Sequence, residues 1–224
     1  MSRDSHRAIS GQAVARLLLA AGAIRVSAAQ PFFLAAGWAS PVYVDCRLLI
    51  GRPRWRRSVT DLAAATLARA PACEFEMVAG AETAGIPWAG FLAERLDLPL
   101  RYVRRQPLGI GRNAQVEGGP VEGCSVLLVD DLITDGSSKT AFVRGLRQAG
   151  AVVTDAFAIF HHALFPGSQQ RLDDLALRLH VLAGWEDLLR LDPGEGMEKA
   201  ERAVLEAFLA DPVRWSGSHG GREG

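Results

Sequence analysis

Lysine is almost absent from this chain of 224 residues: Lys139 and Lys199 are the only two lysines among 25 basic residues. Any role that lysine usually fills in catalysis or anion binding must therefore be filled by arginine or be missing. The chain also lacks a net charge, because 25 acidic residues balance the basic ones. This balance argues against nucleic acid or an anionic membrane as a general partner, so any site for an anion must be local.

Cysteines and long apolar runs are scarce as well. The three cysteines, Cys46, Cys73 and Cys124, are an odd number without the spacing of a metal motif. We expect buried thiols in a reducing compartment rather than disulfides. No apolar run approaches the roughly 18 residues that a membrane span needs, and the polar segment 1–6 lacks the form of a signal peptide. We therefore expect a cytoplasmic protein without a membrane partner.

The chain does contain a regular alternation of strand-like and helix-like segments. Its length and its 49% hydrophobic content suit one α/β domain with a small appendage. Strands that alternate with helices predict a mainly parallel central sheet with right-handed crossovers. The expected strands are 24–34, 42–47, 76–79, 100–104, 126–129, 152–160 and 176–183, and the expected helices are 10–21, 54–70, 87–96, 139–148, 168–174, 186–191 and 197–210.

The most informative segment is 126–138. Four successive apolar residues predict a strand buried on both faces, near the centre of the sheet. Asp130 and Asp131 follow at its carboxyl end, where open α/β sheets bind ligands, and such a pair can bind vicinal hydroxyls or hold Mg²⁺ through water. The turn 134–138 then offers hydroxyl and backbone N–H groups before a helix, which suits an anion. The alternative is an ordinary strand end and a turn with a helix cap.

The complete segment resembles the 5-phosphoribosyl 1-pyrophosphate (PRPP) binding motif of the type I phosphoribosyltransferases. The resemblance implies that Asp130 and Asp131 bind the ribose hydroxyls. The other residues that would bind PRPP, with the 5-phosphate at 134–138, are Leu132, Ile133, Thr134, Asp135, Gly136, Ser137 and Ser138. The family's fold is a mainly parallel sheet flanked by helices, with a small hood built from the N- and C-terminal segments. One domain would then have a hood of about 10–45 and 165–215, a core of about 46–164, and disordered ends at 1–8 and 216–224.

Four other segments, 37–45, 80–87, 102–105 and 111–118, resemble orotate phosphoribosyltransferase in their order and spacing. By this resemblance Thr83, Ala84 and Gly85 would bind pyrophosphate, although an ordinary strand-to-helix turn would contain the same glycine. Arg104 and Arg105 would bind phosphate oxygens through their guanidinium groups. Residues 105–117 would form a lid. The orotate pocket would include Ser40, Tyr43, Val44, Thr134 and His162.

The lid departs from the pattern Val-Arg-Lys-x-x-Lys-x-His-Gly of the resembling family. Leu108 and Ile110 stand where the pattern has its second lysine and its histidine, and an apolar side chain cannot neutralise developing charge. Either Arg112 supplies the missing cation or the rate is low. The catalytic residues would then be Asp130, Asp131, Arg105 and Arg112. His161 and His162 stand where many members of that family place an Asp-Arg pair that contacts the carboxylate of orotate. Either one of the histidines replaces that pair, or the histidines are structural residues at the end of a strand.

The resemblance implies an enzyme of pyrimidine (UMP) biosynthesis that joins orotate to PRPP and forms orotidine 5′-phosphate and pyrophosphate. It also implies a homodimer, and Mg²⁺ held by Asp131 through water. Two alternatives remain open. One is a regulatory homologue that binds PRPP without catalysis, which Leu108 and Ile110 favour. The other is a phosphoribosyltransferase that acts on another nucleobase.

Overall fold

The main sheet of the protein is formed by six strands. The computed structural model describes residues 3–27, 29–34, 36–71, 73–107, 115–134, 136–192 and 194–223. The strand order is β10 (Arg178–Gly184), β9 (Val152–His161), β8 (Ser125–Ile133), β5 (Met77–Ala81), β6 (Leu100–Val103) and β7 (Val116–Glu117). All neighbouring pairs are parallel except β6 with β7. The expected mainly parallel sheet is confirmed, and β8 lies inside it as the apolar run indicated.

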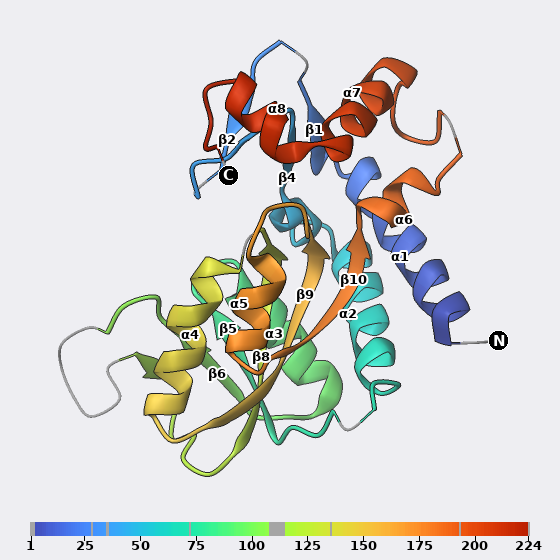
Figure 1. Ribbon diagram of the computed structural model, residues 1–224. Helices are drawn as coiled ribbons and strands as arrows, with labels where there is room; N and C mark the ends of the chain where they lie inside the picture. The colour runs from blue at the N-terminus through green and yellow to red at the C-terminus, as the bar shows by residue number, and fades with distance from the viewer. Residues whose placement is uncertain are drawn as a thin grey trace.

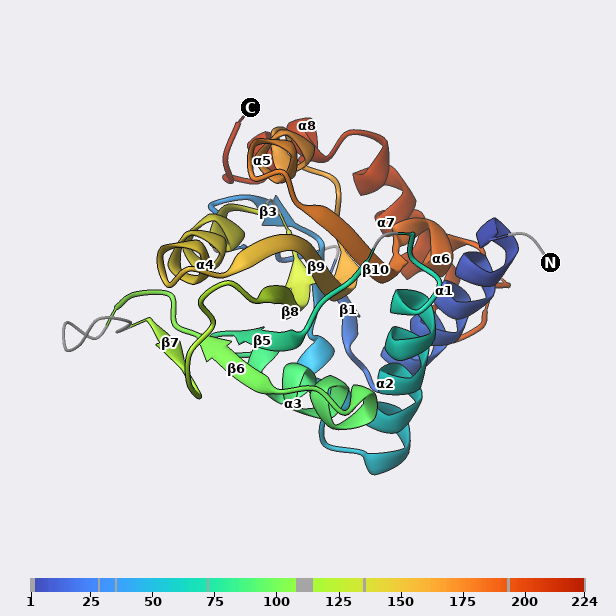
Figure 2. The same cartoon turned by 90° about the horizontal axis from the view of Figure 1, so that it is seen from below.

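Helices cover both faces of this sheet (Figure 2). Helices α2 (Pro53–Leu67) and α3 (Gly85–Leu96) lie on one face, and α4 (Ser137–Gln148) and α5 (Ser168–Asp174) lie on the other. Side chains alternate along β8, so Leu127 and Val129 enter the core under α2 and α3, while Val126 and Leu128 enter the core under α4 and α5. An uninterrupted apolar run is what a strand needs when both of its faces are buried.

A smaller layer, the hood, lies over the carboxyl ends of the main strands (Figure 1). It contains two antiparallel pairs, β1 (Ile24–Val26) with β4 (Val42–Val44) and β2 (Phe32–Phe33) with β3 (Ala39–Ser40). The helices α6 (Trp185–Leu189), α7 (Lys199–Ala210) and α8 (Pro212–Ser218) complete it. Trp38, Phe165 and Phe208 form a separate small core there. The 3₁₀ helix η1 (Cys46–Leu49) connects β4 to the core, and Asp45 caps it by accepting a hydrogen bond from the Arg47 N–H.

Both predicted disordered ends are ordered in their described parts. Helix α1 (Arg3–Ala20) begins well before Ser10 and packs against β10 and α6. At the other end, the prediction for 216–224 is wrong for Ser216 to Arg222. The buried Ser216 hydroxyl accepts a hydrogen bond from the Ala39 N–H and donates one to the Arg222 carbonyl. The Arg222 guanidinium lies over the Trp38 ring. The tail is therefore fixed by contacts with the hood that its polar, glycine-rich composition did not reveal.

Other boundaries also need correction. Strand β10 pairs with β9 in the main sheet, and α5 covers that sheet, so 168–184 belongs to the core and not to the predicted hood. Strand β8 continues to Ile133, so Asp130 and Asp131 lie within it rather than beyond its end. Pairing with β9 persists there, since Ile133 is level with His161. Among the described residues, no helix is both long enough and apolar enough to cross a membrane.

Candidate active site

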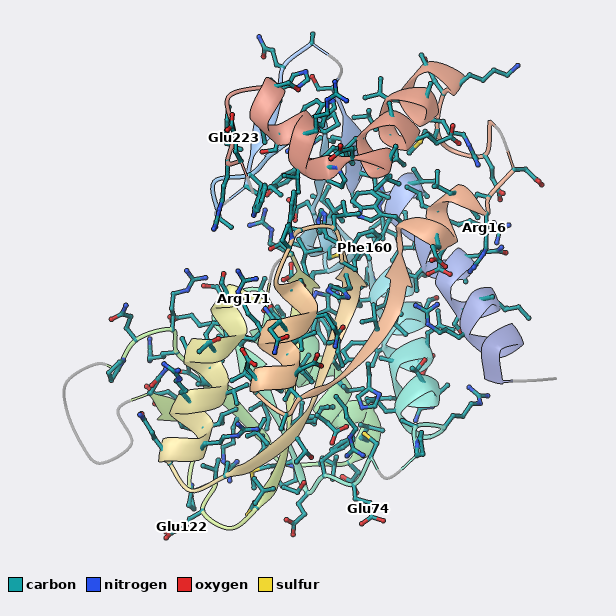
Figure 3. The ribbon with its side chains drawn as sticks, in the orientation of Figure 1. Arg16, Glu74, Glu122, Phe160, Arg171 and Glu223 are labelled. Atoms are coloured by element: carbon teal, nitrogen blue, oxygen red, sulfur yellow. The ribbon has the colours of Figure 1, made fainter. Side chains whose placement is uncertain are left out.

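The acidic pair lies in the last part of β8, between β5 and β9 and below the hood. Phe160, near the end of β9, lies at the same end of the sheet as the acidic pair, whereas Glu74 and Glu122 lie at the opposite end (Figure 3). Asp130 and Asp131 are both half-buried. The carboxylate of Asp130 accepts a hydrogen bond of 2.9 Å from the Asp131 N–H. The pair is therefore where the sequence predicted a ligand site, at the carboxyl end of a central strand.

The two carboxyl groups differ in their electrostatic surroundings. Burial, and then the charge of Asp130, raise the pKa of Asp131 to about 7. Asp130, in contrast, forms an ion pair with the ammonium group of Lys139. Because ionised Asp131 is disfavoured in the free protein, this carboxyl group gains from any ligand that brings positive charge or hydroxyl donors to it.

Lys139 is a site residue that the sequence reasoning missed. Its side chain is only 2% exposed, and besides Asp130 its ammonium group donates a hydrogen bond of 3.2 Å to the Ser138 hydroxyl. It stands on α4 and reaches back to β8. The sequence did contain a clue to this role, because Lys139 is one of two lysines in the chain and directly follows the turn 134–138. Lys139 positions the acidic pair by holding Asp130.

A close backbone contact brings the turn 83–85, which was predicted to bind pyrophosphate, to the acidic pair. Helix α3 begins at Gly85, directly beside β8. A Cβ atom on Gly85 would lie 3.0 Å from the Cα of Asp130 and nearer still to the carbonyl oxygen of Val129. Glycine is thus required for this approach. Ala84 is the N-cap of α3 and provides no side-chain hydrogen bond to the N–H groups of the first turn. The predicted residues Thr83, Ala84 and Gly85 therefore form a helix start next to Asp130, with N–H groups suited to an anion.

The turn after β8 ends at a second helix N-terminus. Gly136 has φ 77°, which favours glycine, and is the N-cap of α4 without a side-chain cap. Ser137 is exposed, while Thr134 and Ser138 are half-buried, and Leu132 and Ile133 form the last part of β8. Asp135 lies outside the described residues. Helix α4 begins at Ser137, two residues earlier than predicted, so the hydroxyl groups of Ser137 and Ser138 are in its first turn.

The first residues of the predicted lid contact Glu82, which directly precedes the turn 83–85. Glu82 accepts a hydrogen bond of 2.8 Å from the Arg105 N–H and lies 3.6 Å from the guanidinium of Arg104. Arg104 also pairs with Glu117, which raises its pKa. The backbone of Arg105 thus lies beside the turn, and the residue is exposed. Residues 108–114, including Leu108, Ile110 and Arg112, lie outside the described residues.

Gln115 is a second residue that the sequence reasoning missed. Its side-chain amide donates hydrogen bonds to the carbonyls of Arg104 (2.8 Å) and Ala141 (3.2 Å), which joins both ends of the lid to α4. Gly145 makes room for this amide, because a Cβ there would lie 2.5 Å from the Gln115 Cδ atom. No spacing rule in the sequence connects residues 104, 115 and 141.

The predicted orotate residues of the hood are only partly available to a ligand. Ser40 is buried, and its hydroxyl donates to the Val42 carbonyl (2.8 Å) and accepts from the Val42 N–H (3.1 Å). Val44 is buried in the pair with β1. Tyr43 is half-buried, its ring lies beneath the Arg25 guanidinium, and its hydroxyl accepts a hydrogen bond from Arg47. Among these residues, Tyr43 offers the side chain for contact with a planar ring.

His162 lies in an apolar setting. Its ring is buried between Phe160 and Trp185, and neither ring nitrogen has a hydrogen-bond partner. Burial lowers its pKa to about 3, so the ring is neutral at physiological pH. Burial also lowers the pKa of His161. The contact between His162 and orotate stays a prediction, and it would involve a hydrogen bond rather than a positive charge.

The acidic pair fits the metal that the resemblance implies. Carboxylate oxygens are ligands that Mg²⁺ prefers, and Mg²⁺ usually retains several waters while it bridges one or two carboxylates to substrate phosphates. A cation near Asp131 would also offset the burial and like-charge repulsion that raise its pKa. Residues 130–131 therefore suit a hydrated Mg²⁺ ion.

Comparisons with known proteins show the family of this chain. The phosphoribosyl transferase domain family matches residues 53–174. Orotate phosphoribosyltransferase of Rhizobium rhizogenes is 44% identical over 219 residues, covering 97% of this chain and 94% of the relative. That of Rhizobium etli is 46% identical over 217 residues, covering 96% and 94%. The crystal structure of orotate phosphoribosyltransferase from Aeropyrum pernix has a TM-score of 0.67 at 34% identity, covering 79% of this chain and 96% of that one. This chain therefore belongs to the orotate phosphoribosyltransferase family.

Proposed function

We propose that the protein transfers the phosphoribosyl group of PRPP to orotate, forming orotidine 5′-phosphate and pyrophosphate for UMP biosynthesis. The observation that carries the proposal is the contact of Gly85 with the end of β8, which joins a helix N-terminus to an acidic pair. A sugar diphosphate needs both features close together, one for its anionic end and one for its hydroxyls. Relatives of 44–46% identity that carry this name support the same conclusion.

PRPP would lie across the end of β8. The N–H groups of Thr83, Ala84 and Gly85 would bind pyrophosphate, and Arg104 and Arg105 would add positive charge on the same side. Asp130 and Asp131 would accept hydrogen bonds from the ribose hydroxyls. The turn 134–138 and the first turn of α4 would bind the 5-phosphate.

Catalysis would depend on charge, because positive charge develops on the ribose and negative charge on the departing pyrophosphate. The acidic pair stabilises the first, and Arg105 together with Arg112 stabilises the second. Mg²⁺, when bound with PRPP at Asp131 through water, supplies further charge neutralisation for the diphosphate. Lys139 keeps Asp130 in place through its ion pair.

Orotate would enter from the hood, against Tyr43 and the backbone at Ser40 and Val44, with Thr134 and His162 on the opposite side. Because His162 is neutral, recognition of the orotate carboxylate falls to hydrogen bonds and arginines. We also infer a cytoplasmic homodimer, which the resemblance to the family supports.

The test is incubation of the purified protein with PRPP, Mg²⁺ and a panel of nucleobases while pyrophosphate release is followed. Release with orotate alone is the expected result. Release with another base would mean a different specificity. If no base supports release but calorimetry detects PRPP binding, the protein is a regulatory homologue and the proposed reaction is wrong.

A further inference from the structure

A cysteine, an aspartate and a histidine meet at the β10 edge of the main sheet, outside the candidate active site. Asp155 lies on β9, level with Leu127 of β8, and His180 lies on the edge strand β10. Cys73 belongs to the connection between α2 and β5. One ligand atom from each residue lies within 4.8 Å of the others, and among the described residues this is the one such group of three or more Cys, His, Asp or Glu side chains.

Hydrogen bonds hold the side chains of this cluster in place. One oxygen of Asp155 accepts hydrogen bonds of 2.8 Å from both Arg178 and the Thr154 hydroxyl. The other oxygen lies 2.7 Å from Nε2 of His180, which in turn lies 3.4 Å from Sγ of Cys73. The side chain of Asp155 is 3% exposed and that of His180 is 13% exposed. The side chains of Asp155 and His180 are thus largely out of water, Cys73 is half-buried, and the carboxylate is oriented by partners of its own.

The geometry excludes a Cys-His-Asp nucleophile. In such a triad the thiol contacts one ring nitrogen and the carboxylate contacts the other. Here Sγ of Cys73 and the Asp155 oxygen both contact Nε2 of the same ring. Burial also raises the pKa of Cys73 to about 11, so the free thiol is not a thiolate at neutral pH.

The same geometry suits a metal ion. With Zn²⁺ bond lengths of about 2.3 Å to sulfur and 2.0–2.2 Å to nitrogen and oxygen, tetrahedral ligands lie roughly 3.6 Å (S to N) and roughly 3.4 Å (N to O) apart. The observed 3.4 Å contact between Sγ and Nε2 already matches the first value. The contact between Nε2 and Asp155 needs to widen by less than 1 Å, from 2.7 Å. We propose that Cys73, Asp155 and His180 form a binding site for Zn²⁺ or a chemically similar divalent transition metal.

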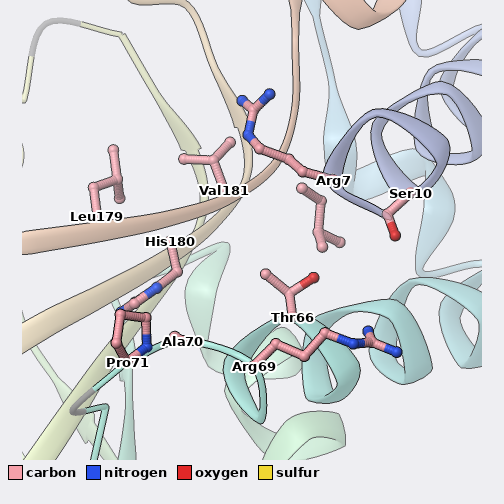
Figure 4. A pocket seen from close by; sticks show the side chains of 10 residues that line it. Arg7, Ser10, Thr66, Arg69, Ala70, Pro71, Leu179, His180 and Val181 are labelled. Atoms are coloured by element: carbon pink, nitrogen blue, oxygen red, sulfur yellow. The ribbon is translucent and has the colours of Figure 1, made fainter. Parts of the chain in front are cut away.

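Charge and location support this site. A thiolate and a carboxylate together balance the charge of a divalent ion, and binding would release the thiol proton of Cys73. His180 also lines a cleft of about 280 Å³ between α1, α2 and β10, where it lies beside Pro71 (Figure 4). That cleft gives solvent access to the histidine. The bound ion would link β9, β10 and the segment before β5.

Cobalt is the probe, because a thiolate bound to Co²⁺ gives a charge-transfer absorption band that carboxylate sites such as the acidic pair do not. Tag-free protein, first treated with a chelator, is titrated with CoCl₂ and then with ZnCl₂. We expect a band that saturates at one equivalent and disappears when Zn²⁺ displaces Co²⁺. Cys73→Ser should abolish it, and His180→Gln should weaken binding. Cys124→Ser, a change at another half-buried cysteine, should leave it intact.

A second measurement needs no variant. Alkylation of each cysteine in the native protein is followed by peptide mass spectrometry with and without Zn²⁺. At a Zn²⁺ concentration ten times the dissociation constant, labelling of Cys73 should slow about tenfold, while that of Cys124 is unchanged. Absence of a cobalt band, a band that persists in Cys73→Ser, or equal labelling of Cys73 with and without Zn²⁺ would overturn the proposal.

Discussion

Replacing Gly85 with alanine is the substitution most directly aimed at the contact that joins the two halves of the proposed PRPP site. The added Cβ would lie 3.0 Å from the Asp130 Cα and still closer to the Val129 carbonyl oxygen, both of which are backbone atoms of a buried strand. Because β8 is held by β5 and β9 on its two sides, the start of α3 must move instead. This shift would separate the N–H groups of residues 83–85 from the acidic pair.

The magnitude follows from packing. An extra methyl group forced into a filled space costs about 1–3 kcal/mol. If half or more of this cost appears in PRPP binding, affinity falls about 2-fold to 140-fold, since 1.4 kcal/mol is a factor of ten. Helix propensity acts in the opposite direction, because alanine is favoured over glycine in a helix by up to about 1 kcal/mol. Gly90→Ala, in the same helix, shares that gain but meets no atom closer than 3.8 Å, so it is the matched control.

The assay is calorimetric titration of each variant with PRPP and Mg²⁺, with thermal unfolding to confirm the folded state. Gly85→Ala should bind PRPP more weakly than both the unchanged protein and Gly90→Ala. If the two alanine variants bind PRPP equally well, the start of α3 takes no part in the site and the reasoning fails.

Three other substitutions test the site. Asp131→Asn should bind PRPP more weakly than the unchanged protein, as measured by calorimetry. The pKa of Asp131 is raised from 3.8 to about 7 in the folded protein. Between about pH 4 and pH 7 the folded protein therefore keeps a proton on Asp131 that the unfolded protein has lost. The free energy of unfolding should thus fall as the pH rises through this range. Denaturant titrations should show that the free energy of unfolding falls less with pH in Asp131→Asn than in the unchanged protein. The same pH dependence in both proteins would contradict the raised pKa of Asp131. Lys139→Met should lower the free energy of unfolding by about 3–5 kcal/mol, because Asp130 loses its buried partner; the exposed Lys199→Met is the control, and equal stability of the two would contradict the role of Lys139. Arg112→Ala should reduce turnover in the pyrophosphate assay far more than PRPP affinity, and unchanged turnover would remove Arg112 from the mechanism.

The central part of the fold could be predicted because its signals are local. The apolar run 126–129 indicated a doubly buried strand, which is confirmed, and Asp130 and Asp131 lie near its carboxyl end, although the strand continues past them to Ile133. The helix after the turn 134–138 was also expected, although it begins two residues earlier. Periodicity and turn chemistry determine these features within a single segment of chain.

What the sequence did not reveal depends on contacts between distant segments. Ser216 and Arg222 appeared to belong to a disordered tail, yet they bind Ala39 and Trp38 of the hood. Gly85 was expected to bind pyrophosphate, but its contact with β8 was not foreseen, because that contact arises only when two parallel strands lie side by side. Cys73 lacked any metal-type spacing for a similar reason, since its neighbours Asp155 and His180 come from two later strands.

A crystal structure of the protein with PRPP and Mg²⁺ tests the central claim most directly. The account predicts ribose hydroxyls within hydrogen-bonding distance of Asp130 and Asp131, the diphosphate at the N-terminus of α3, and the 5-phosphate at the start of α4. PRPP bound away from the end of β8, or with its ribose hydroxyls out of reach of both carboxylates, would contradict it.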